Sequence, residues 1–129
     1  MTDDDYELMF DLPTEIAELE SSDEALVAVN LEGVVVLISK PAQALLGVTP
    51  EEGLGEFVEA MMPKELRWGH QAYRRGYQAQ PSEREMDPGL EPHAQRPDGT
   101  LVPIAVRLEP MWPDGKLFVV AHITERFEG

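Results

Sequence analysis

Short runs of apolar residues, several of them β-branched, divide the chain into elements. Residues 25–29 and 34–38 are almost entirely apolar, and a short turn containing Gly33 separates them. Two such runs joined by a glycine turn are typical of an antiparallel hairpin. Further strands are predicted over residues 90–95, 101–108 and 117–123. The last of these is nearly all apolar, which favours a central place in a sheet.

Helical segments are predicted between the hairpin and the later strands. Pro41 and Pro50 each suit the first position of a helix, while Gly47 and Gly53 suit the ends of those two helices. The expected helices span residues 41–46, 50–52, 56–62 and 63–78, and residues 79–89 read as a loop without a regular period. Only the helix over 63–78 is long.

The first 21 residues form an acidic leader with an apolar stripe. No basic residue precedes Lys40. The stripe recurs at helical spacing and predicts two short helices, over residues 3–11 and 13–20. Its members are Leu8, Met9, Leu12, Ile16 and Leu19. A stripe of this kind packs either against its own domain or against a partner chain.

Composition excludes several classes of function. With 129 residues the chain fits one domain, and its net charge of −15 disfavours binding to nucleic acid or to anionic membranes. The absence of cysteine rules out disulfides, thiolate metal sites and a cysteinyl-flavin adduct. No apolar stretch is long enough for a membrane span, and the acidic start is unlike a signal peptide. We therefore expect a cytoplasmic protein.

The residues at the joints between these elements carry a resemblance to a known family. The matching segments are Asp23-Glu24-Ala25-Leu26-Val27-Ala28-Val29, Leu31-Glu32-Gly33, Pro41-Ala42-Gln43-Ala44-Leu45-Leu46-Gly47, Pro50-Glu51-Glu52-Gly53-Leu54-Gly55, Arg96-Pro97-Asp98-Gly99-Thr100-Leu101-Val102-Pro103 and Ile123-Thr124-Glu125-Arg126. In this order and spacing, over residues 22–126, the chain resembles the PAS sensor domains. Two positions depart from the pattern: Lys40 stands where the family often has Asn, and His122 where it commonly has Asp.

The resemblance implies an α+β fold with a five-stranded antiparallel sheet in the order 2-1-5-4-3. Short helices and one longer helix would lie across one face and enclose a small pocket. We accordingly divide the chain into a leader, residues 1–21, and a PAS domain, residues 22–129. The family commonly dimerises through helices that flank the core, and it passes a signal to an output partner. Since the sequence stops at Gly129, we expect that partner to be a separate protein.

The residues that we expect to bind a ligand lie on the long helix and on the strands. The predicted pocket residues are Leu37, Leu66, His70, Tyr73, Tyr77, Val106 and Val119. His70 and Tyr73 would supply the polar contacts in a mostly apolar site. The predicted homodimer interface is the leader stripe, Leu8, Met9, Leu12, Ile16 and Leu19.

Haem is the alternative cofactor. The spacing His-x-x-Tyr-x-x-x-Tyr, formed by His70, Tyr73 and Tyr77, looks like the helix that carries the proximal ligand in oxygen-sensing PAS kinases. In that interpretation His70 binds the iron, whereas in the other it is a structural or solvent-facing residue. The distal arginine of those sensors would fall near Gly89 or Leu90, which cannot donate from a side chain. Noncovalent flavin stays open as a third cofactor.

Neither a metal site built from protein ligands nor catalysis is predicted. The spacing of His70, His93 and His122 matches no ligand motif, so haem iron is the one metal considered. The adjacent acids Glu51 and Glu52 suit a helix start better than proton transfer. We therefore expect a sensory module that binds a small ligand, dimerises and contacts a partner protein. The competing hypothesis is an adaptor or inhibitor whose acidic leader binds a basic surface.

Overall fold

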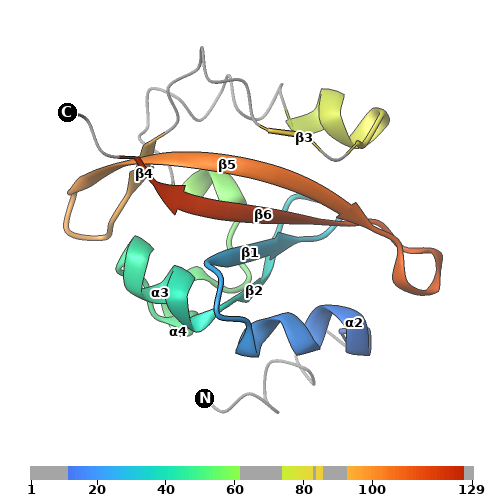
Figure 1. Ribbon diagram of the computed structural model, residues 1–129, viewed down its shortest axis with the longest axis horizontal. Helices are drawn as coiled ribbons and strands as arrows, with labels where there is room; N and C mark the ends of the chain where they lie inside the picture. Colours follow the sequence, from blue (N-terminus) through green and yellow to red (C-terminus); the bar gives the residue numbers. More distant parts are fainter. Residues whose placement is uncertain (1–11, 62–73, 83, 86–92, 127–129) are drawn as a thin grey trace.

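The computed structural model describes residues 12–61, 74–82, 84–85 and 93–126, and these form an antiparallel sheet with helices on both sides (Figure 1). The strand order is β2-β1-β6-β5-β3, and β4 pairs with β5. The strands are β1 (Leu26–Val29), β2 (Val35–Ile38), β3 (Arg84–Glu85), β4 (His93–Gln95), β5 (Leu101–Met111) and β6 (Phe118–Glu125). Counting β3 and β4 as the third strand of the family pattern, this is the predicted order 2-1-5-4-3.

The sheet is organised around its last strand. β6 pairs antiparallel with β1 along one edge, where Val27 lies opposite Ala121, and with β5 along the other, where Val106 lies opposite Ile123. Its first three residues are buried. The central position predicted from the apolar run near the C-terminus is therefore confirmed. β5 and β6 are the longest strands, and they extend beyond the bounds that the apolar runs indicated.

The short helices begin and end where proline, glycine and hydroxyl side chains predict. In α3 (Lys40–Leu46), Ser39 is the N-cap and Gly47 closes the helix at a φ of 64°. In α4 (Pro50–Gly53), the Thr49 side chain accepts a hydrogen bond from the Glu52 amide, and the Glu52 carboxylate accepts one from the Thr49 amide. This reciprocal capping box satisfies two amides that the first turn leaves without helical partners.

Other elements are shorter than the sequence indicated. The predicted helix over residues 56–62 is a 3₁₀ turn, η2 (Val58–Met61), and the strand predicted over residues 90–95 is described only as β4. The predicted loop over residues 79–89 contains β3, so that part of the prediction was wrong. Of the long helix predicted over 63–78, residues 74–79 are helical and the earlier part lies outside the described residues.

The leader forms α2 (Thr14–Ala17) and the 3₁₀ turn η1 (Glu18–Ser21), with Pro13 at the N-cap. These confirm the second of the two predicted helices, while the first, over residues 3–11, lies outside the described part of the chain. No helix among the described residues has the length and apolarity needed to cross a membrane.

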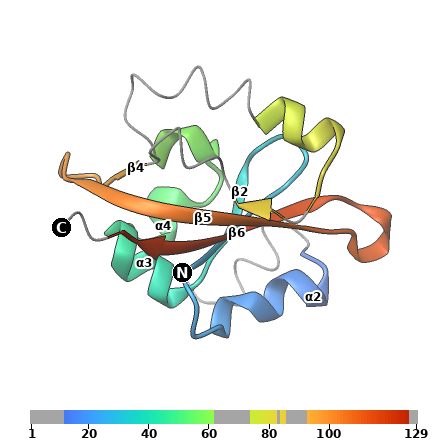
Figure 2. The same cartoon turned by 45° about the horizontal axis from the view of Figure 1, so that its top comes forward.

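Apolar side chains pack on both faces of the sheet. One cluster, on the cavity face, joins strand residues such as Val106 and Val119 to Tyr77 of the helix at 74–79. The second cluster, on the leader face, joins Ile16 of α2 to Leu37, Val120 and other strand residues. Figures 1 and 2 show α2 and the helix of residues 74–79 on opposite sides of the sheet. The cavity face carries the candidate site.

Candidate ligand-binding cavity

A cavity of about 110 Å³ lies between the sheet and the helix at residues 74–79. Its strand walls alternate along β5 and β6, because every second side chain of a strand points to the same face. The strand residues are Val27, Val29, His93, Ala94, Ile104, Val106, Leu108, Val119, Ala121 and Ile123. The helical walls are Leu46, Val58, Met61, Arg74, Tyr77 and Gln78. Most of this surface is apolar, so the described lining favours an apolar ligand.

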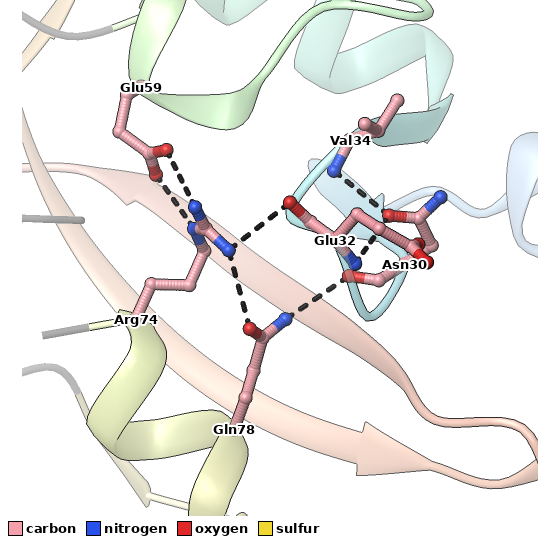
Figure 3. Close-up of polar contacts among 6 residues, drawn as sticks. All are labelled: Asn30, Glu32, Val34, Glu59, Arg74 and Gln78. Atoms are coloured by element: carbon pink, nitrogen blue, oxygen red, sulfur yellow. Dashed lines mark hydrogen bonds and ion pairs between the residues drawn. The ribbon is translucent and has the colours of Figure 1, made fainter. Parts of the chain in front are cut away.

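The polar wall of the cavity contains a buried ion pair. The Arg74 guanidinium donates through Nε to Glu59 Oε2 at 3.1 Å and through Nη2 to Glu59 Oε1 at 3.2 Å (Figure 3). The Glu59 side chain is only 3% exposed and that of Arg74 12%. A two-point contact of this kind between a guanidinium and a carboxylate is both strong and geometrically specific. It ties η2 to the helix at residues 74–79.

The same arginine also reaches the turn between β1 and β2. Its Nη1 donates to the Glu32 carbonyl and to Gln78 Oε1, each at 3.3 Å. Gln78 Nε2 in turn donates to the Asn30 carbonyl at 3.1 Å. The side-chain oxygen of Asn30 accepts from the amides of Glu32 and Val34, which fixes the turn itself (Figure 3). Helix, turn and 3₁₀ segment therefore form one hydrogen-bonded unit.

Gly33 allows this approach. Its φ is +84°, and a Cβ placed there would lie 2.3 Å from the Arg74 guanidinium. Such a distance is far inside any normal contact, so a side chain at position 33 would displace the arginine. The glycine that the sequence marks as a hairpin turn residue thus also makes room for the polar wall of the cavity.

The structure brings together part of the predicted pocket. Tyr77, Val106 and Val119 line the cavity, and the Tyr77 hydroxyl donates to the Ser82 carbonyl. The prediction that Leu37 lines the pocket is wrong, because Leu37 is buried on the leader face. Val36 and Leu37 of β2 pack on the side of α2, and only the end residues of the strand pack on the cavity face. Leu66, His70 and Tyr73 lie outside the described residues, so their roles, including haem ligation by His70, stay predictions.

Sequence reasoning missed Arg74 and Glu59 as site residues. The helical pattern places Arg74 only within the long helix, and it leaves Glu59 among many surface acids. Nothing in the spacing of Glu59 sets it apart from the exposed Glu52 and Glu56 nearby. An arginine about one turn before the apolar Tyr77, on the face expected to be buried, was the signal that could have suggested a buried partner.

The two described histidines lie on different faces of the sheet. His93 lines the cavity from β4. His122 lies on the leader face, where its Nε2 is 2.8 Å from Glu109 Oε1 and its Nδ1 is 3.5 Å from Glu24 Oε2. The Nε2 contact links β6 to β5, whereas Nδ1 is buried and has no hydrogen-bond partner among the described residues. Within the described ranges, no cluster of three histidine or acidic side chains could hold a metal.

The leader stripe faces its own sheet. Ile16 is fully buried against the second cluster, and Leu12 and Leu19 are partly buried beside it. The prediction that Ile16 contacts a partner chain is therefore wrong, because its side chain fills an intramolecular site and offers no surface to a second chain. Leu8 and Met9 lie outside the described residues. Dimerisation through the leader stays a prediction.

The chain was compared with known families and structures. The family model described as the PAS fold matches residues 19–128. Comparison with curated proteins gave no match. Because the family model covers most of the chain, it carries more weight than any single structural likeness.

Solved structures show the same fold at low identity. The PAS domain of an HTR-like protein from Haloarcula marismortui has a TM-score of 0.67 at 18% identity, covering 85% of this chain and 92% of that one. The PAS domain of the RpfR quorum-sensing receptor from Cronobacter turicensis, in complex with BDSF, has a TM-score of 0.65 at 14% identity, with 83% and 97% covered. The Rhodobacter sphaeroides LOV protein has a TM-score of 0.71 at 18% identity; 87% of this chain matches 65% of that one.

Proposed function

Because the chain belongs to the PAS family, whose domains are generally sensory rather than catalytic modules, we propose that it senses a small molecule bound in the cavity described above. The observation that supports this proposal is the cavity itself. It lies between the sheet and the helix at residues 74–79, is partly open to the surface, and has described walls in which apolar side chains dominate.

The size of the cavity indicates a compact ligand. An apolar cavity of about 150 Å³ in another protein stays dry and binds benzene. By the same comparison, a cavity of about 110 Å³ suits a molecule no larger than benzene, with at most about six non-hydrogen atoms. Occupancy would act on β5 and β6, whose side chains form much of the wall and whose other face packs against the leader.

A titration with 2-pentanone, a neutral probe of six non-hydrogen atoms, tests the cavity. Two-dimensional NMR of the ¹⁵N-labelled protein should show saturable shifts at amides of lining residues such as Val106 and Val119. Ala121→Leu adds three carbon atoms inside the cavity and should abolish these shifts. Because the added carbons enter empty space, the cost to stability should stay below about 1 kcal/mol.

Ala105→Leu is the matched control. Ala105 is on β5, but its side chain is exposed on the strand's outward side. The same substitution there adds the same carbon atoms without entering the cavity, so binding should persist. If the wild-type protein shows no saturable shifts at lining residues, the cavity does not bind molecules of this size and the proposal is overturned.

A further inference from the structure

The polar side chains on the helical wall of the cavity are already used within the chain. Arg74 makes four hydrogen bonds, two to Glu59 and one each to Glu32 and Gln78. The charge of the guanidinium is therefore matched by a carboxylate that is itself buried. A second carboxylate brought in by a ligand would meet a cation whose charge is balanced.

The other two polar residues with which this helix lines the cavity are engaged in the same way. Gln78 accepts from Arg74 through its oxygen and donates to the Asn30 carbonyl through its nitrogen. The Tyr77 hydroxyl donates to the Ser82 carbonyl. To bind a charged group, the helix would have to break contacts that hold the β1–β2 turn and η2 in place.

We infer that Glu59, by neutralising Arg74, keeps the cavity selective for uncharged apolar ligands over carboxylates of the same size. This inference rests on the proposed function, because it concerns the ligand of the same cavity. The physical reason is that an ionised carboxylate loses its hydration on entering an apolar site and must find a cation there to compensate. Among the described lining residues, Arg74 is the side chain that is always charged, and Glu59 already neutralises it.

The inference assigns Glu59 the role of a specificity-determining residue. Removing its charge while keeping its shape should leave Arg74 on the cavity wall with an unbalanced positive charge. A ligand carboxylate could then take the place of Glu59 as the partner of the guanidinium. The glutamine would still accept a hydrogen bond from Arg74, which helps to keep the arginine in position.

Two isosteric probes test the inference. Butanoate and 2-pentanone share the same three-carbon chain and number of non-hydrogen atoms, but only butanoate is charged. We would titrate both into the full chain by NMR at pH 8, where an ordinary histidine is neutral and butanoate is ionised. The wild-type protein should bind 2-pentanone at least about 100-fold more tightly, given the cost of burying an unpaired charge.

Glu59→Gln should increase the affinity for butanoate by at least about tenfold, the gain expected from one charge-assisted hydrogen bond, with little effect on 2-pentanone. The matched control is Glu56→Gln, which removes the same charge from an exposed side chain close by in the sequence and should change neither affinity. If Glu59→Gln does not fold, the double variant with Glu59→Gln and Arg74→Gln removes both charges. This double variant should bind 2-pentanone and still exclude butanoate, because it has no unbalanced cation at the cavity.

The outcomes separate this inference from the proposed function. Equal binding of both probes by the wild-type protein would overturn the selectivity while leaving a working ligand cavity. An increase in butanoate affinity in Glu56→Gln equal to that in Glu59→Gln would also overturn it, since the net charge of the protein would then account for the effect. Binding of neither probe by the wild-type protein would overturn the cavity proposal and this inference together.

Discussion

At the scale of single residues, Gly33 combines two requirements that are usually separate. Its positive φ closes the β1–β2 turn, where its amide donates to the Asn30 carbonyl at 3.0 Å. Its missing side chain leaves space for the Arg74 guanidinium. Either requirement alone favours glycine, and together they connect the hairpin turn to the wall of the cavity.

Gly33→Ala should destabilise the protein by about 2–4 kcal/mol, adding a steric clash to the strain of a positive φ. The matched control is Gly99→Ala. Gly99 has a φ of +91°, but a Cβ added there would meet nothing within 4 Å, so this variant carries the strain without the clash. Chemical denaturation of both variants measures the difference directly, and equal losses would contradict a close contact with Arg74.

At the scale of elements, Ser39 connects α3 to the sheet. Its side chain is completely buried. The hydroxyl oxygen accepts a hydrogen bond from the Leu26 amide at 2.8 Å, the hydroxyl donates to the Glu24 carbonyl at 2.8 Å, and the oxygen also caps the Ala42 amide at 3.4 Å. One hydroxyl thus positions the first turn of α3 against the start of β1.

Ser39→Ala should lower the free energy of unfolding by about 2–4 kcal/mol, because it removes a helix cap and leaves buried backbone groups without partners. The control is Ser21→Ala. Ser21 is exposed and its hydroxyl donates only to the nearby Glu18 carbonyl, so its loss should change stability by less than about 0.5 kcal/mol. Urea unfolding provides the comparison. A loss at Ser39 as small as that at Ser21 would show that water replaces its contacts.

At the scale of the whole molecule, the leader covers one face of the sheet, and the helix at residues 74–79 lies over the other. Ile16 is fully buried on the leader face, and the apolar residues beneath the leader include Leu37, Phe118 and Val120. A leader that bound only a partner would leave these side chains exposed in the single chain. The described part of the leader is therefore part of the core of this domain.

Deletion of residues 1–21 should expose this apolar face. We expect a less stable protein that associates through the uncovered sheet, since large exposed apolar patches promote association. Light scattering after size exclusion would measure the mass, and thermal denaturation the stability. A deletion variant that is a monomer with unchanged stability would show that the leader does not contribute to the core. Ile16→Asp in the full chain provides a second test and should act in the same direction.

Local patterns in the sequence were sufficient for much of the fold. Proline, glycine and hydroxyl residues at the ends of α3 and α4 determine where these helices start and stop, because caps depend on neighbouring residues alone. The apolar run that forms β6 predicted a central strand, because only a strand covered on both faces needs apolar residues in succession. Alternation along β5 and β6 likewise placed Val106 and Val119 in the cavity.

The tertiary structure decided the rest, because those features depend on contacts between distant segments. Arg74 meets Glu59 across 15 positions and the Glu32 carbonyl across 42, and no local pattern identifies either of them as its partner. The prediction for Leu37 chose the wrong face: Leu37 lies opposite Ala28, and both residues pack on the leader face. The sequence alone therefore determined most of the elements, their order and the apolar character of the site. Packing alone determined which charge faces that site and which partner neutralises it.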